Sequence, residues 1–436
     1  MSFPRYLKYK PSGVEWLRDV PEHWAIKPLY SCAEERNENN KGMIENNLLS
    51  LSYGKIVRKD ISSNDGLLPE SFETYQIVRR GDIVFRPTDL QNDWNSLRSA
   101  IVEETGIITS AYIATKPNGP TPKYLHYLFR VYDTMKVFYS MGGGLRQSMK
   151  YSDLKRLPVI VPPITEQTAI AAFLDRETAK IDALVTEQQR LMELLKEKRQ
   201  AVISHAVTKG LNPKAPMKPS GIEWLGDVPE HWTVQRVKSL TNILRGKFTH
   251  RPRHDPAMYD GPYPFIQTGE INQANRFVGQ YHQTLSEAGF QQSKQFPKGT
   301  LVMTITGAGT ANVAILDYEA CFPDSIVGFV PKNGMALDYL YNLFVAMRQA
   351  LLETSVTNTQ PNLNIERIGA LLAVQPPLHE QADIIARIDK VSANYEGLII
   401  EAQHAIDLLQ ERRTALISAA VTGQIDVRSF AKKEAA

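Results

Sequence analysis

The chain has 436 residues, of which 43% are hydrophobic and 22% are charged, and its formal net charge is +3. This composition excludes a disordered or fibrous protein, and the length predicts about two domains plus accessory elements. The two cysteines, Cys32 and Cys321, lie in different halves and exclude a disulfide framework. Because no apolar run reaches the roughly 18 residues of a membrane span, we expect a cytoplasmic protein with no membrane partner.

The first element in the chain is a segment that returns in the second half. Residues 10–24 read KPSGVEWLRDVPEHW, and residues 218–232 read KPSGIEWLGDVPEHW. Two further pairs of stretches match later in each half: PPITEQ (162–167) with PPLHEQ (376–381), and LLKEKRQAVIS (194–204) with LLQERRTALIS (408–418). Two copies in one chain predict an approximate internal two-fold, which suits a two-fold partner such as duplex DNA.

A globular α/β stretch follows each leading segment, at about residues 25–155 and 233–365. Residues 80–85 and 298–303 each read as a turn and a β-prone run, and a short helix is expected near 124–129 and again at its counterpart in the second half. Between these landmarks the residues diverge freely. A shared frame with individual contents favours two domains that recognise different surfaces over two copies of one catalytic site.

The second globular stretch opens with a basic run. Residues 236–253 contain six Lys or Arg residues and no acid. Such a run fits contact with phosphates, because each neutralised phosphate releases a counterion, although a solvated basic loop has the same composition.

Each globular stretch is followed by one long helix, predicted over residues 165–207 and 379–421. Both ranges lack proline and carry apolar residues at helical spacing, and Gly210 and Gly423 follow where a left-handed cap is needed. About 42 helical residues span roughly 63 Å, too long for one domain to bury, so the helices are expected to pack on each other in antiparallel fashion. Poor helix formers around Gly397 allow a bend in the second helix.

The motifs that would carry chemistry are missing. The Pro-Pro pairs lack the residues of an amino-methyltransferase turn, no phosphate-binding Gly-rich loop is complete, and the histidines and cysteines have no metal-ligand spacing. His23 and His231 belong to the repeated segment and are expected to hold a turn. The chain is therefore predicted to be no enzyme by itself, to bind no metal and to hold no cofactor.

The alternation of a variable domain with a repeated PPxxEQ helix resembles the specificity subunits of type I restriction–modification systems, from about Tyr9 to Val427. The resemblance implies an α/β (α+β) fold with two target recognition domains separated by two long antiparallel helices. Each domain would read one half of a split double-stranded DNA target, and the helices would fix the unread spacer. Partners would be two modification subunits, which supply S-adenosylmethionine and adenine N6 methylation, and restriction subunits, which use ATP and Mg.

The domain boundaries follow from this frame. They are, in chain order, the first leading segment, the first recognition domain, the central helix, the second leading segment, the second recognition domain, and the distal helix with its tail: 1–24, 25–155, 156–212, 213–232, 233–365 and 366–436.

Base readout needs forked or bidentate side chains on loops, Arg for guanine and Asn or Gln for adenine. The best run in the first domain is 142–148, where glycines allow close backbone approach, and its match in the second domain is 357–364. The candidate DNA-binding residues of the first domain are Arg146, Gln147, Ser148, Lys55, Arg58, Lys59, Arg86, Asn92, Asn95 and Arg98. Those of the second domain are Lys247, Arg251, Arg253, His254, Gln267, Asn272, Thr359, Gln360, Asn362 and Asn364.

Two alternatives stay open. One is a pseudo-symmetric recognition or scaffold subunit of another DNA-modifying or phage-exclusion complex. The other is a scaffold that binds proteins and no DNA, which the salt dependence of binding would separate from a DNA-recognition subunit.

Overall fold

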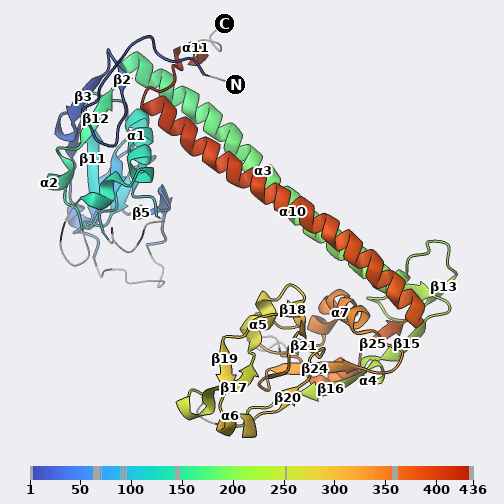
Figure 1. Ribbon diagram of the computed structural model, residues 1–436. Helices are drawn as coiled ribbons and strands as arrows, with labels where there is room; N and C mark the ends of the chain where they lie inside the picture. The colour runs from blue at the N-terminus through green and yellow to red at the C-terminus, as the bar shows by residue number, and fades with distance from the viewer. Residues whose placement is uncertain are drawn as a thin grey trace. The chain divides into compact units, whose positions relative to one another are not determined.

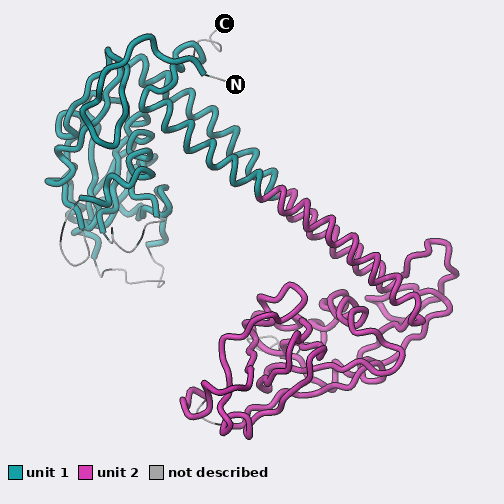
Figure 2. The backbone as a smooth tube through the Cα atoms, in the orientation of Figure 1, with its two compact units in different colours: residues 1–189, 404–436 teal, residues 190–403 magenta. Residues whose placement is uncertain are grey.

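The computed structural model describes residues 3–61, 69, 71–88, 90, 93, 96–141, 143, 148–250, 253–355 and 362–431. The chain forms two compact units (Figure 2). Unit 1 contains residues 1–189 and 404–436, and unit 2 contains residues 190–403. The division falls inside both long helices, so each unit holds one globular stretch and parts of both helices.

Unit 1 is built on a four-stranded antiparallel sheet with the strand order β4-β11-β8-β9. Its β-strands are β1 (Tyr9–Lys10), β2 (Val20–Pro21), β3 (Ala25–Pro28), β4 (Ala33–Glu35), β5 (Leu49–Ser52), β6 (Lys55–Arg58), β7 (Gln76–Val78), β8 (Ile83–Phe85), β9 (Ser99–Ile101), β10 (Gly106–Ile108), β11 (Ile113–Pro117) and β12 (Pro158–Val161). Its short helices are η1 (Leu29–Ser31), η2 (Lys41–Met43), α1 (Pro122–Thr134), η3 (Val137–Ser140), α2 (Tyr151–Leu154) and α11 (Arg428–Ala431).

Unit 2 repeats this frame with the strand order β16-β24-β21-β22, to which β18 adds in parallel. Its β-strands are β13 (Met217–Pro219), β14 (Asp227–Pro229), β15 (Thr233–Arg236), β16 (Thr241–Arg245), β17 (Tyr259–Phe265), β18 (Phe277–Val278), β19 (Gln283–Leu285), β20 (Gln295–Phe296), β21 (Leu301–Thr304), β22 (Val313–Leu316), β23 (Ala320–Cys321), β24 (Ile326–Pro331) and β25 (Leu372–Gln375). Its short helices are α4 (Val237–Leu240), η4 (Pro256–Met258), α5 (Thr268–Gln273), α6 (Glu287–Gln291), α7 (Leu337–Ala346), α8 (Arg348–Glu353) and α9 (Ile365–Ala370).

The long helices agree with the sequence prediction to within one or two residues at each end. Helix α3 covers Ile164–Lys209, and α10 covers Leu378–Val421 without a break at Gly397. Gly210 and Gly423 follow them with φ of +74°, the left-handed conformation that glycine adopts without a steric penalty. Among the described residues, none of the helices carries an apolar stretch long enough to cross a bilayer.

Within each unit, α3 and α10 lie side by side and run in opposite directions (Figure 1). The first part of α3 shares the unit 1 core with the last part of α10, as with Leu174 and Leu416. The last part of α3 shares the unit 2 core with the first part of α10, as with Ile203 and Ile384. Each core therefore contains residues from the first part of one long helix and the last part of the other. Both helices pack against each globular stretch.

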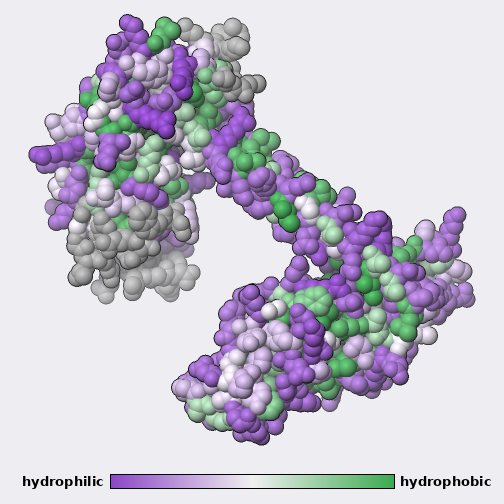
Figure 3. Space-filling model, in the orientation of Figure 1, coloured by the Kyte–Doolittle hydropathy of each residue, from purple (hydrophilic) through white to green (hydrophobic). Residues whose placement is uncertain are grey.

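The outer faces of the long helices keep several large apolar side chains in contact with solvent. Figure 3 shows hydrophobic residues interspersed with polar ones along this region. They are at least 44% exposed: Leu184 and Leu408 in unit 1, and Leu191, Leu194, Leu398 and Ile400 in unit 2.

Candidate nucleic-acid interface

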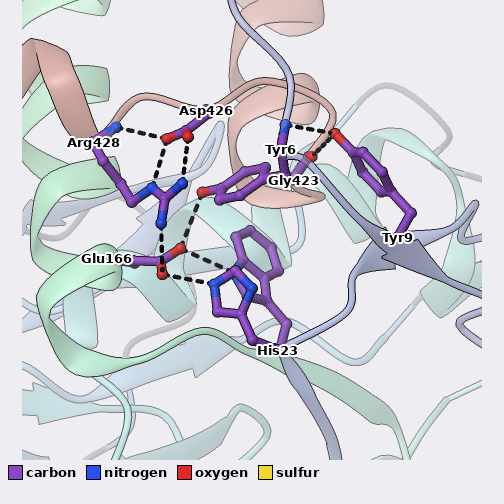
Figure 4. Close-up of polar contacts among 8 residues, drawn as sticks. Tyr6, Tyr9, His23, Glu166, Gly423, Asp426 and Arg428 are labelled. Carbon is purple, nitrogen blue, oxygen red and sulfur yellow. Dashed lines mark hydrogen bonds and ion pairs between the residues drawn. The ribbon is translucent and has the colours of Figure 1, made fainter.

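The repeated PPxxEQ motif ties each leading segment to the start of a long helix. In unit 1, Glu166 in the first turn of α3 accepts a hydrogen bond from Trp24 Nε1 at 3.0 Å, and its other oxygen lies 2.7 Å from His23 Nε2 (Figure 4). In unit 2, Glu380 accepts from Trp232 Nε1 at 3.0 Å and lies 2.6 Å from His231 Nε2. We call these two clusters the Glu166 joint and the Glu380 joint.

The glutamine of the same motif holds the globular stretch. Gln167 accepts a hydrogen bond from the backbone N–H of Thr121, which directly precedes α1, at 2.7 Å. Gln381 accepts one from the backbone N–H of Ala336, directly before α7, at 2.8 Å. Because both glutamines are fully buried, these contacts fix the helices of each globular stretch on the long helices. The repeated residues thus build the scaffold that joins each leading segment and each globular stretch to a long helix.

The two joints are not equal. Glu166 also accepts from Tyr6 Oη at 3.1 Å, and Arg428 lies 3.8 Å from it (Figure 4). Arg428 also forms an ion pair with Asp426 at 2.6 Å, and this contact lowers the pKa of Asp426. Burial and the charge of Glu166 raise the pKa of Tyr6. At the other joint, burial alone would raise the pKa of Glu380, but the hydrogen bonds from Trp232 and His231 lower it.

Three basic candidates of unit 1, Lys55, Arg58 and Lys59, lie on or directly beside a surface hairpin. Strands β5 and β6 form it, and its tip is fixed where Arg130 Nη2 donates to the carbonyl of Gly54 at 2.6 Å. Lys55 and Lys59 are exposed. Arg58 is exposed as well and pairs with Glu104, with a 2.6 Å hydrogen bond from its Nε.

Arg98 is a correction to the predicted interface. Its side chain is fully buried, and it donates to the carbonyls of Thr88 at 2.6 Å and Asp93 at 2.5 Å. It also lies over the ring of Tyr139. A buried guanidinium that crosslinks loop carbonyls does not reach a groove, so Arg98 stabilises its loop. Arg86, by contrast, is partly exposed and lies 3.9 Å from Asp93.

Several predicted readers lie outside the described residues. These are Asn92, Asn95, Arg146, Gln147, Arg251, Thr359 and Gln360. For them the DNA contact remains a prediction from the sequence. The described neighbours Ser148 and Asn362 mark where two of these loops join the scaffold.

Most described candidates of unit 2 are exposed and polar. Lys247 and His254 are exposed, and Arg253 pairs with Asp324 at 2.6 Å. Gln267 donates to Gln283 at 2.6 Å, and Asn272 accepts from Asn312 at 2.9 Å. These hydrogen bonds orient the amides at the surface without burying them.

Asn364 has a local structural role, because its side chain caps α9 by accepting from the N–H of Glu366 at 2.7 Å. Its side-chain oxygen is thus partly used within the protein.

The backbone places the described C-terminal ends of the two predicted readout runs at equivalent positions. In unit 1, the N–H of Met149 donates to the carbonyl of Pro87 at 3.1 Å. In unit 2, the N–H of Leu363 donates to the carbonyl of Ile305 at 2.9 Å. Both acceptors follow the equivalent strands β8 and β21, so Ser148 and Asn362 occupy the same place in the two units.

A hollow of about 510 Å³ lies at this place in unit 2. Its polar lining includes Arg245, Asn362, Asn364 and Glu366. Among these, Arg245 and Glu366 are absent from the sequence-based candidates. Arg245 belongs to the basic run, but nothing in the sequence separates it from its neighbours or joins it to residues more than a hundred positions away.

Comparisons with known proteins agree on one family. The model of the type I restriction modification DNA specificity domain matches residues 229–403. A putative type I restriction enzyme MjaX specificity subunit of Methanocaldococcus jannaschii is 25% identical over 433 residues, covering 94% of this chain and 96% of that protein. The EcoBI specificity subunit of Escherichia coli is 20% identical over 274 residues, covering 61% of this chain but only 58% of that protein.

The fold has a solved counterpart. A chain from the structure described as the structural basis of complex assembly and conformational transition of the type I R-M system has a TM-score of 0.62 at 16% identity, covering 93% of this chain and 99% of that one. At this identity the likeness shows the fold, which mixes helix and strand and includes the two long helices. The family model over residues 229–403 and these relatives show that the chain is similar to the specificity subunits of type I restriction–modification systems, and the solved structure shows that it shares their fold.

Proposed function

We propose that this chain is the DNA-recognition subunit of a type I restriction–modification system and does no chemistry itself. Unit 1 and unit 2 each read one half of a split, asymmetric target in double-stranded DNA, and the long helices set the spacer. The chain directs adenine N6 methylation by modification subunits that bind S-adenosylmethionine. Restriction subunits with ATP and Mg complete the complex.

The observation that carries the proposal is the division between repeated and individual residues. The Glu166 and Glu380 joints and both buried glutamines make the same contacts twice. At the equivalent readout position one unit has Ser148 and the other has Asn362. A constant scaffold with different polar residues at one place suits two readers of different DNA letters.

The exposed apolar residues on the long helices support protein partners. Large apolar side chains at or above 44% exposure repeat along α3 and α10 in both units. Covering them would remove apolar surface from water, which favours association. The helices are therefore proposed as the surface that the modification subunits contact.

The test is single-molecule sequencing of N6-methyladenine in DNA from a host that expresses this chain with the methyltransferase gene beside it. A deletion strain that keeps the methyltransferase is the control. We expect a split, asymmetric methylated motif that disappears on deletion. Unchanged methylation with an active methyltransferase contradicts the proposal and favours a scaffold in another complex.

A further inference from the structure

The hollow of unit 2 is built from three separate segments. Arg245 is the last residue of β16, Ile305 directly follows β21, and Asn362 to Glu366 lead into α9. These segments are far apart in the sequence, so the hollow cannot be recognised from it. Only the order of the strands in the sheet brings the segments together.

The apolar floor of the hollow is firmly held. Leu363 and Ile305 are 2% and 5% exposed and are joined by the 2.9 Å backbone hydrogen bond. At the end of β16, Gly246 is so close to the chain opposite that a Cβ would lie 2.1 Å from the carbonyl oxygen of Pro323. Since backbone contacts fix both walls of the hollow, the polar side chains at its rim are attached to rigid backbone.

The rim side chains have their hydrogen-bonding groups available. Arg245, Asn362 and Glu366 are exposed, and within the described part of the chain none of the three side chains makes a hydrogen bond or an ion pair. Arg245 supplies a fork of donors, Glu366 supplies acceptors, and Asn362 supplies both.

The charges argue for a base edge and against a phosphate. The hollow has one cation, Arg245, and one anion, Glu366, so it offers little net attraction to a phosphate, and Glu366 would repel one. In the major groove, guanine presents two acceptors and its paired cytosine presents an amino donor. A fork of donors beside a carboxylate matches that pattern.

Resting on the proposed function, we propose that this hollow reads one G·C base pair of the half-site recognised by unit 2. Arg245 donates to O6 and N7 of the guanine, and Glu366 accepts from N4 of the cytosine. Asn362 contacts the adjoining base. Arg245 and Glu366 are thus specificity-determining residues of this half-site.

The experiment selects duplexes from a library with two randomised blocks and a variable spacer. The bait is the full-length chain purified with the methyltransferase subunits encoded beside it. The wild type should enrich a split motif with a G·C pair in the half-site of unit 2. Arg245→Ala should reduce discrimination at that pair roughly 5- to 150-fold, and leave the other half-site unchanged.

Two further variants separate base contact from other roles. Arg245→Lys keeps the charge and loses the planar fork, so it should retain affinity for duplexes of random sequence and show a weaker guanine preference than the wild type. Arg236→Ala is the matched control, because Arg236 is an exposed arginine at the end of β15, in the same unit and outside the hollow. It should leave the motif intact.

The outcomes are distinguishable. If the wild type enriches no motif, the proposed function fails and this inference fails with it. If the wild type enriches a motif and Arg245→Ala leaves every position unchanged, only the inference is overturned. A loss of affinity by Arg245→Ala that is equal for all duplexes, with every position of the motif unchanged and the affinity restored by Arg245→Lys, would assign Arg245 to a phosphate and overturn it as well. A melting temperature equal to that of the wild type controls for folding.

Discussion

Glu166 and Glu380 perform the same task in different surroundings. Each receives an indole N–H and a histidine from its leading segment. Glu166 has two further partners and a side chain that is 9% exposed, against 27% for Glu380. The cost of removing a charge rises with burial and with the number of donors left unpaired.

We therefore expect Glu166→Gln to destabilise the protein more than Glu380→Gln does. The amide nitrogen of glutamine cannot accept, so a donor is left unpaired at about 1–3 kcal/mol in the buried joint. The more exposed joint should lose about 1 kcal/mol or less. Urea unfolding followed by tryptophan fluorescence measures both variants, and equal losses would contradict the ranking.

His126 makes the stability of unit 1 depend on pH. It lies on α1, its Nδ1 is buried without a hydrogen-bond partner among the described residues, and burial together with Arg130 lowers its pKa to about 3. In the unfolded chain this histidine is protonated as the pH falls through its ordinary pKa of about 6.5. In the folded chain it stays neutral until the pH approaches 3. Stability from this group is therefore present above pH 6.5 and is lost as the pH falls toward 3.

The variant His126→Phe should remove this loss, because phenylalanine has no proton to bind. Between pH 7 and pH 5 its free energy of unfolding should fall by up to about 2 kcal/mol less than that of the wild type. Urea titrations at the two pH values measure the difference. His205→Phe is a control, since it places the same substitution outside α1. An identical pH dependence of the wild type and His126→Phe would refute the assignment.

At the scale of elements, the long helices act as the proposed spacer. Equivalent segments, residues 187–193 of α3 and 401–407 of α10, can be removed together without touching either globular stretch. Seven residues correspond to about 10.5 Å of helix, or up to about three base pairs of duplex.

The double deletion should shorten the spacer of the methylated motif and leave the letters of both half-sites unchanged. Single-molecule methylation sequencing measures both properties at once. A single deletion in α3 alone is the control, because it mismatches the two helices and should reduce methylation. A shortened protein that keeps the original spacer would disprove the spacer role.

At the scale of the molecule, the +3 net charge is too small to decide for or against DNA. Salt dependence decides it, because affinity falls with salt in proportion to the phosphates contacted. The chain, purified with the proposed methyltransferase subunits, should lose duplex affinity roughly 10³-fold or more between 50 and 200 mM salt if it contacts about six phosphates or more. A nearly flat salt dependence would favour a protein-binding scaffold.

The sequence predicted the regular parts of this protein well. Both long helices, their glycine caps, α1 and α7 agree with the structure. The reason is physical: helix boundaries depend on local periodicity, capping and the absence of proline, all of which are written along the chain. Where two copies carry the same signals, each supports the other.

The individual surface residues were harder to predict. Arg98 has the composition of a DNA reader and is buried instead, because burial depends on which carbonyls surround it. Arg245 and Glu366 went unnoticed, because a hollow depends on segments brought together by sheet order. The amino-acid sequence gives the number of hydrogen-bond donors but not their positions in the folded protein.

The sequence by itself thus determined the two-copy organisation, the long helices and the family resemblance, since repetition and periodicity are local and survive without coordinates. Only the tertiary structure decided that the PPxxEQ motif holds the leading segments through Glu166 and Glu380, and that Ser148 and Asn362 are equivalent. The physical reason is that hydrogen bonds between distant segments form only after the sheets and helices have packed.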